Sequence, residues 1–200
     1  MKLYYFPVAP NPTRVRTYLA EKGIEIEQVL VNLREGEQKS PEHLARNPHG
    51  NLPVLEFDDG TFLTESLAII EYFEEIHPEP PMLGTDPRSR ARVRSLERLV
   101  DSTVLGPIAR IVHATNSPLG MPPVPEIAKQ ESENLPYALE VVQARMGDQP
   151  FLAGDRPTVP DCTLFAALRF GGFFGIELDP RFTGLTRWLD DFSKRPSANL

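Results

Sequence analysis

The chain is 200 residues long and carries a formal net charge of −7, so it has room for one large domain or two small ones. The acidic balance argues against a nucleic-acid-binding surface, which needs a basic face to replace counterions along the phosphates. No run approaches the roughly 18 apolar residues of a membrane-spanning helix, and the aromatic start does not resemble a signal sequence. We therefore expect a cytoplasmic protein with no nucleic-acid and no membrane partner.

The first 78 residues predict strands and helices in the order βαβαββα. Residues 2–6 form the first β-rich run, and Asn11 is expected to cap a helix with Pro12 at its first position. Gly23 is a natural end for this helix. Alternating apolar and polar residues over 24–31 then predict a second strand.

The remaining elements of this part are marked by caps and a turn. Ser40 is expected to begin a short helix, and residues 54–57 and 61–63 flank the turn Asp58-Asp59-Gly60 as a hairpin. Apolar residues at helical spacing over 66–76 predict the final helix.

A run of prolines near residue 80 marks the expected domain boundary. We assign residues 1–78 to the first domain, 79–86 to a linker and 87–200 to an all-helical domain. A long periodic segment over 88–115 contains Pro107, which predicts a kink near 103–106. Another helix is expected over 125–146.

Cysteine and histidine usage excludes several kinds of site. Cys162 is the only cysteine, which excludes an internal disulfide, a Cys-x-x-Cys redox pair and a thiolate zinc cluster. The four histidines are scattered, and none forms a pair at metal-binding helical spacing. We expect no metal, and any thiol chemistry requires a thiol that arrives with a ligand.

Four local motifs carry a family resemblance. They are Asn51-Leu52-Pro53-Val54-Leu55, Glu65-Ser66, Thr158-Val159-Pro160-Asp161 and the segment Glu37-Gln38-Lys39-Ser40-Pro41-Glu42. With these motifs the chain resembles the cytosolic glutathione transferase family from end to end. The resemblance implies a thioredoxin-like α/β domain with a mixed four-stranded sheet, followed by an all-α helical bundle. It also implies glutathione as co-substrate and a homodimer.

The first two motifs are expected to bind glutathione. Proline at the head of a strand can hold a cis bond cheaply, so Leu52-Pro53 would expose the Leu52 backbone to the cysteinyl backbone of the tripeptide. Ser66 and the amides of a helix N-terminus suit the γ-glutamyl carboxylate, while Glu65 suits the ammonium group.

The other two motifs are weaker guides to chemistry. The resemblance makes Gln38, Lys39 and Asn51 candidate contacts for the glycyl carboxylate, with a solvated loop as the alternative. Thr158 and Asp161 form a capping box at the start of a buried helix. This box supports the fold alone and places Cys162 where an inert thiol is expected.

The group that activates the thiol departs from the usual pattern. Alignment with serine-type members places Ala9 at the serine position, and Ala9 cannot donate a hydrogen bond from its side chain. Tyr4 and Tyr5 lie in the first strand and point to opposite faces, so one of them is an alternative. Pro10-Asn11 resembles the pair of nu-class bacterial members, so we predict that Asn11 is the catalytic donor to sulfur.

The second substrate is expected between the domains, where pockets commonly form. Val104, Ile108, Ile111 and Phe173 are the candidate lining residues, with ordinary core packing as the alternative. Three functions remain open. They are conjugation of glutathione to a small hydrophobic electrophile, nu-class-like reduction of disulfides with two glutathione molecules, and a non-catalytic interaction protein that kept the fold.

Overall fold

The computed structural model describes residues 1–199, and its first part contains a four-stranded sheet in the order β2-β1-β3-β4. Strand β1 (Lys2–Tyr5) pairs in parallel with β2 (Glu27–Leu30) and antiparallel with β3 (Val54–Glu56). Strand β4 (Phe62–Thr64) pairs antiparallel with β3 and completes the hairpin. The sheet is mixed, as expected.

Three α-helices and a short 3₁₀ turn accompany this sheet. They are α1 (Pro10–Lys22), α2 (Pro41–Arg46), α3 (Ser66–Ile76) and the 3₁₀ turn Glu37–Lys39. Buried side chains of α1, such as Val15 and Tyr18, share one core with Ile70 and Phe73 of α3 and with Leu3 of β1. The predicted βαβαββα order is confirmed.

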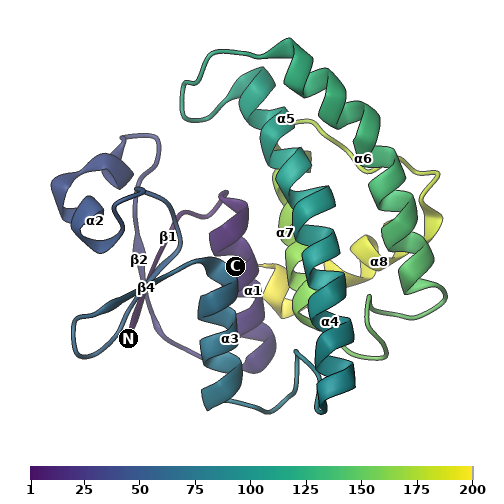
Figure 1. The fold of residues 1–200 in the computed structure, drawn as a ribbon, viewed down its shortest axis with the longest axis horizontal. Coiled ribbons are helices and arrows are strands. Elements are labelled where there is room, and N and C mark those ends of the chain that lie inside the picture. Colours follow the sequence, from purple (N-terminus) through teal and green to yellow (C-terminus); the bar gives the residue numbers. More distant parts are fainter. Residues whose placement is uncertain (200) are drawn as a thin grey trace.

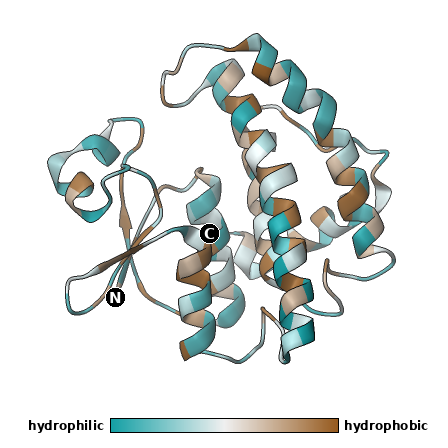
Figure 2. Ribbon diagram, in the orientation of Figure 1, coloured by the Kyte–Doolittle hydropathy of each residue, from teal (hydrophilic) through white to brown (hydrophobic). Residues whose placement is uncertain are grey.

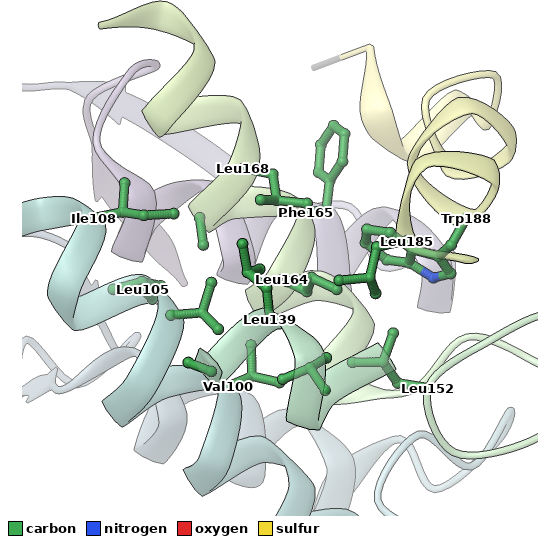
Figure 3. Packing of buried hydrophobic residues seen from close by; sticks show 14 of the residues in the cluster. Val100, Leu105, Ile108, Leu139, Leu152, Leu164, Phe165, Leu168, Leu185 and Trp188 are labelled. Carbon is green, nitrogen blue, oxygen red and sulfur yellow. The ribbon is translucent and has the colours of Figure 1, made fainter. Parts of the chain in front are cut away.

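The regular elements described in the second part are all helices, and the one β feature is an isolated bridge between Phe151 and Gly154. This part comprises α4 (Pro87–Val100), the π-helical stretch Asp101–Leu105, α5 (Gly106–Asn116), α6 (Pro125–Met146), α7 (Val159–Phe173), α8 (Thr183–Phe192) and the 3₁₀ turn Pro196–Ala198. Its core is built around α7, where Leu164, Phe165 and Leu168 meet side chains of α5, α6 and α8 (Figure 3). Along these helices hydrophobic and hydrophilic positions alternate (Figure 2), as amphipathic helices require.

Helix α7 starts at a buried capping box, as predicted. Asp161 Oδ2 accepts hydrogen bonds from the Thr158 backbone N–H at 2.9 Å and the Thr158 hydroxyl at 2.7 Å. Asp161 Oδ1 accepts from the Leu152 N–H and from Trp188 Nε1, both at 2.9 Å. The carboxylate therefore ties the start of α7 to α8 and to the preceding loop.

Two local expectations need correction, and the irregularity expected beside Pro107 takes a specific form. Helix α1 begins at Pro10, with Ala9 as its N-cap, and Asn11 lies inside its first turn. Proline fits at any position of the first turn of a helix because the backbone N–H groups there have no acceptor within the helix. Strand β2 is shorter than residues 24–31, and the disturbance beside Pro107 takes the form of a π-helical stretch.

The two parts contact each other through α1 and α3. Helices α1 and α3 stand between the sheet and the bundle (Figure 1), and α1 packs against α7. Arg195 binds Glu21 of α1 through two hydrogen bonds of 2.6 and 2.7 Å. None of the described helices is long and apolar enough to cross a membrane.

Candidate functional site

A cavity of about 290 Å³ lies between the first domain and the tip of α5. Its walls come from the N-terminal ends of α1 and α3, from the loops on both sides of α2, and from the end of α5. The lining residues are Ala9, Asn11, Leu33, Gln38, Lys39, Asn47, Gly50, Asn51, Leu52, Pro53, Glu65, Ser66, His113 and Leu119. The structure thus brings together Asn11, all the residues predicted to bind glutathione, and Ala9 in the serine position.

Asn11 offers two hydrogen-bond donors to this cavity. The Ala9 N–H binds Phe6 O, the Thr13 N–H binds Ala9 O, and Pro10 and Pro12 have no N–H. The backbone N–H of Asn11 and its side-chain Nδ2 have no acceptor among the described residues. The two prolines therefore make Asn11 the one residue in this turn that can donate to a ligand.

The peptide bond between Leu52 and Pro53 is cis, as predicted. The carbonyl of Asn51, just before it, accepts hydrogen bonds from His43 Nε2 at 3.2 Å and from Asn47 Nδ2 at 3.0 Å. Burial lowers the pKa of His43; a neutral ring with its proton on Nε2 fits this donation. These two buried side chains hold the loop that presents the Leu52 backbone.

Glu65 and Ser66 stand at the start of α3. Glu65 is the only described non-glycine residue with a positive φ, 68°, a conformation that concentrates at functional sites. Ser66 is buried, and its Oγ accepts a hydrogen bond of 2.8 Å from Arg14 Nε. The hydroxyl also lies 3.5 Å from Asn11 Oδ1, so the ends of α1 and α3 meet at this cavity.

At the far wall of the cavity, the loop that contains Gly50 comes close to the turn that contains Gln38 and Lys39. Gly50 has a φ of +66°, and a Cβ there would lie 2.7 Å from Gln38 O and 2.9 Å from Lys39 Nζ. Lys39 Nζ donates to His49 O at 3.1 Å. Gln38 is buried and its Oε1 has no partner among the described residues. A cation and an amide are thus held beside one another at this end.

Arg14 links this cavity to a buried network in the helical domain. Its Nη1 lies 2.7 Å from Asp101 Oδ1 and 3.4 Å from Glu97 Oε1. Thr163 donates to the same Glu97 oxygen at 2.8 Å, while Glu97 Oε2 has no described partner. Burial raises the pKa of Glu97 to about 7, and Arg14 opposes that rise.

A second cavity, of about 100 Å³, adjoins the first and shares Ala9, Leu33, His113 and Leu119 with it. Its walls are mostly apolar and include four phenylalanine rings. The lining residues are Phe6, Val8, Ala9, Pro10, Leu33, Arg34, His113, Pro118, Leu119, Phe170, Phe173 and Phe174. Of the four residues expected to line a second-substrate pocket, Phe173 is present.

The other three of those residues lie elsewhere. Val104, Ile108 and Ile111 are at most 6% exposed and belong to the core of the helical domain, where Figure 3 shows Ile108 among core side chains. These apolar residues at helical spacing face the bundle interior, so the apolar walls of the second cavity come mainly from the end of α7 and from the loops. Tyr4 and Tyr5 are also absent from both walls, and Tyr4 donates its hydroxyl to Glu56.

His113 is a site residue that sequence reasoning missed. It lies on α5 and lines both cavities, with Nδ1 3.0 Å from Ser117 Oγ. Burial lowers its pKa, which favours the neutral form of the ring. Nothing in the local sequence distinguishes it, because its position depends on how α5 meets the first domain. The described residues contain no group of three or more side chains suited to a metal ion.

Comparisons with known proteins agree with this geometry. Residues 3–81 match the family described as glutathione S-transferase, N-terminal domain, and residues 109–196 match glutathione S-transferase, C-terminal domain. Glutathione S-transferase 2 of Saccharomyces cerevisiae is 30% identical over 99% of this chain and 88% of its own length. Maleylacetoacetate isomerase of Pseudomonas aeruginosa is 34% identical over 90% of this chain and 85% of its own.

Solved structures give the same result. The crystal structure of Gtt2 from Saccharomyces cerevisiae has a TM-score of 0.92 and 29% identity, and the match covers 100% of this chain and 99% of that one. A glutathione S-transferase domain-containing protein from Marinobacter aquaeolei has a TM-score of 0.92 and 31% identity, covering 99% and 100%. The likeness therefore extends over both parts of the fold.

Proposed function

Because this chain belongs to the cytosolic glutathione S-transferase family, we propose that it conjugates glutathione to a small hydrophobic electrophile. One observation carries the proposal. The cavity lined by Leu52, Glu65 and Ser66 has donors and acceptors for a tripeptide, and it shares part of its wall with an apolar cavity lined by Phe173. A polar site and an apolar site with a common wall suit a reaction between a peptide thiol and an apolar partner.

Glutathione would lie along the first cavity. The γ-glutamyl carboxylate is placed at Ser66 and the N-terminus of α3, where the helix dipole favours an anion. Its ammonium group pairs with Glu65, and the cysteinyl backbone pairs with that of Leu52. The glycyl carboxylate lies at Lys39, with Gln38 and Asn51 beside it. The two charged ends of the tripeptide thus meet opposite charges at opposite ends of the cavity.

The thiol would then lie beside Ala9 and Asn11, at the border of the two cavities. A thiol with a pKa of about 8.5 is only a few per cent ionised at neutral pH. Donation from the Asn11 N–H and Nδ2, together with the dipole of α1, favours the thiolate. The neutral ring of His113, on the opposite wall, can accept the proton that the thiol loses.

The chemical step is a displacement. The thiolate sulfur forms a bond to the electrophilic carbon, and the leaving group departs with the electron pair of the bond that breaks. The protein contributes mainly by holding the sulfur beside the second cavity, since positioning reacting atoms can supply much of a rate enhancement. Cys162 takes no part in this step, because it is buried and burial raises the pKa of its thiol.

Purified protein tests this proposal against its two alternatives. It would be titrated with glutathione by calorimetry and then assayed with a chloronitrobenzene and with hydroxyethyl disulfide. Heat of binding and conjugation of the chloronitrobenzene are the expected results. Disulfide reduction without conjugation would instead select the nu-class-like reaction, which needs no protein cysteine. Absence of both heat and turnover would leave the non-catalytic interaction protein, which Ala9 favours.

The homodimer implied by the family is part of the same proposal. Phe62 on β4 and Ile76 at the end of α3 are exposed hydrophobic residues in the first domain, which a second copy of the chain could cover. Light scattering on the purified chain should give twice the monomer mass of 22.5 kDa. A monomer at micromolar concentration would contradict this expectation.

A further inference from the structure

We propose that Arg34 makes the second cavity selective for single-ring aromatic electrophiles that carry an anionic substituent. This inference rests on the proposed transferase function and deepens it, because it names the chemical class of the second substrate. It is built from the shape of the second cavity, its aromatic walls and the position of one cation at its edge.

The walls select for a flat, apolar group. Phe170 and Phe174 have ring centroids 5.0 Å apart at 64°, and Phe173 and Phe174 are 5.1 Å apart at 73°. Edge-to-face arrangements of this kind can be extended by a further ring at similar spacing. The cavity volume of about 100 Å³ is smaller than the roughly 150 Å³ of a dry cavity that accommodates benzene. One ring therefore fits if part of it stays open to solvent, and a fused ring system would leave more of its apolar surface exposed.

Arg34 is the only permanently charged residue in the walls of this cavity. His113, the other titratable residue there, is neutral at pH 7 because burial lowers its pKa. No carboxylate that the structure describes lies within ion-pair distance of Arg34, although Glu35 and Glu37 are on the same loop. Glu37 is instead engaged with the Asn32 N–H at 2.6 Å.

The loop that carries Arg34 is held in place by its own hydrogen bonds. The Arg34 N–H donates to Asn32 Oδ1 at 3.1 Å, and the Glu35 and Glu37 N–H groups both donate to Asn32 O at 3.2 Å. Leu33, the preceding residue, lines both cavities. The backbone of Arg34 is therefore held beside an apolar cavity, and its exposed guanidinium can bind a planar carboxylate through two parallel hydrogen bonds.

A matched pair of electrophiles tests this proposal. 4-Chloro-3-nitrobenzoate and 4-chloro-3-nitrobenzamide have nearly the same shape and leaving group, and they differ in one negative charge. Their KM and kcat would be measured at saturating glutathione for the natural chain, for Arg34→Gln, and for Arg187→Gln. Arg187 is an exposed residue of α8 that lines neither cavity, so its variant controls for loss of one positive charge.

The Arg34→Gln variant should raise KM for the benzoate about three- to ten-fold, as expected for one charge-assisted pair at a partly exposed site. Its KM for the benzamide should stay within two-fold, and Arg187→Gln should change neither. Equal changes for both electrophiles would overturn the proposal. So would a rise in the glutathione KM of Arg34→Gln, because it would assign Arg34 to the tripeptide.

Binding measurements keep the proposal separate from the transferase function. If the natural chain turns over neither electrophile, conjugation fails, and calorimetry with the two finished S-aryl glutathione conjugates then decides the role of Arg34. The carboxylate conjugate should bind the natural chain several-fold more tightly than the carboxamide conjugate, and Arg34→Gln should remove that difference. Equal affinities in the natural chain would refute selectivity for the anionic substituent.

Discussion

Arg14 Nε on α1 donates a hydrogen bond of 2.8 Å to Ser66 Oγ on α3, and both side chains are buried. The same guanidinium lies 2.7 Å from Asp101 through Nη1, so its orientation is set from the helical domain. Because Ser66 Oγ accepts from Arg14 and donates its own proton to Asn11 Oδ1 at 3.5 Å, Arg14 orients this hydroxyl at the first cavity. The candidate glutathione site thus depends on a residue that does not itself line the cavity.

Replacing Arg14 with lysine should therefore weaken glutathione binding. A single ammonium group cannot reproduce the rigid fork that serves Ser66 and Asp101 together. Loss of one such hydrogen bond corresponds to about 1 kcal/mol, or about five-fold in Kd, measured by calorimetry. Arg16→Lys is the matched control, because Arg16 lies on the same helix and binds Gln28, outside the cavity. Equal affinity losses in the two variants would refute the specific role of Arg14.

Asn11→Ala should lower kcat/KM about ten-fold, which is less than the roughly hundred-fold or greater effect of removing one preorganised donor from a reacting atom. The loss is limited because the backbone N–H of residue 11 remains and still has no helical acceptor. The pH at which activity reaches half its maximum should also rise, since the thiolate has lost a donor. Steady-state rates between pH 6 and 9 measure both effects. Unchanged turnover and an unchanged pH profile would remove Asn11 from the mechanism.

His113→Gln tests the acceptor of the thiol proton. Glutamine keeps a polar side chain but cannot take up a proton, so kcat/KM should fall about ten- to hundred-fold near pH 6.5, which reaches the lower end of the usual range for general-base catalysis. The defect should be smaller at pH 8.5, where much of the thiol ionises without help. His49→Gln is the control, because His49 contributes its backbone carbonyl to Lys39. A defect that is independent of pH would point to a structural role for His113.

Much of the fold was predictable because its local signals do not depend on tertiary context. Helices over 66–76 and 125–146 were expected with the bounds that the structure has, and the cis bond before Pro53 follows from a motif. The start of α1 was not predictable, because Pro10 and Pro12 both suit a first turn. Which proline begins the helix depends on the hydrogen bond from the Thr13 N–H to Ala9 O.

The candidate site likewise contains residues that the sequence could predict and residues that it could not. Glu65 and Ser66 are adjacent in sequence, so a motif can identify them. Ile108 and Phe173 are both apolar residues on helices, and periodicity alone cannot tell that one faces the core and the other a cavity. His113 and Arg34 enter the site only because the helical domain closes over the first domain, and no short motif contains that information.

Glu97→Gln should flatten the dependence of stability on pH. The pKa of Glu97 rises from 4.5 to about 7 in the folded protein, so between these values the native state holds a proton that the unfolded state has lost. Stability contributed by this group is therefore present below pH 4.5 and declines as pH rises to 7. The shift corresponds to about 3 kcal/mol at most.

Urea unfolding at several pH values between 4.5 and 7.5 would measure this effect. The slope of unfolding free energy against pH would be compared between the natural chain and Glu97→Gln. Burial raises the pKa of Asp161 to about 6. This group therefore also makes stability decline as pH rises, and it does so equally in the natural chain and in Glu97→Gln. The natural chain should therefore lose more stability than Glu97→Gln over this range. Identical slopes would show that Glu97 is ionised throughout.

Gly50→Ala should disrupt the end of the site that holds Gln38 and Lys39. This variant suffers both backbone strain, because φ at residue 50 is +66°, and a steric clash, because the new Cβ would lie 2.7 Å from Gln38 O. Gly60→Ala provides the control, since φ there is +82° and nothing lies within 4 Å of the new Cβ. Both variants should lose about 1 kcal/mol or more of stability in urea from backbone strain.

Only Gly50→Ala should also weaken glutathione binding by about ten-fold, because its loop must move away from the backbone of Gln38 and from the Lys39 ammonium that faces the glycyl carboxylate. Calorimetry on both variants separates these effects. If Gly60→Ala weakened binding as much as Gly50→Ala, general destabilisation would be the cause. If neither did, the close approach of the two loops would have no part in holding the tripeptide.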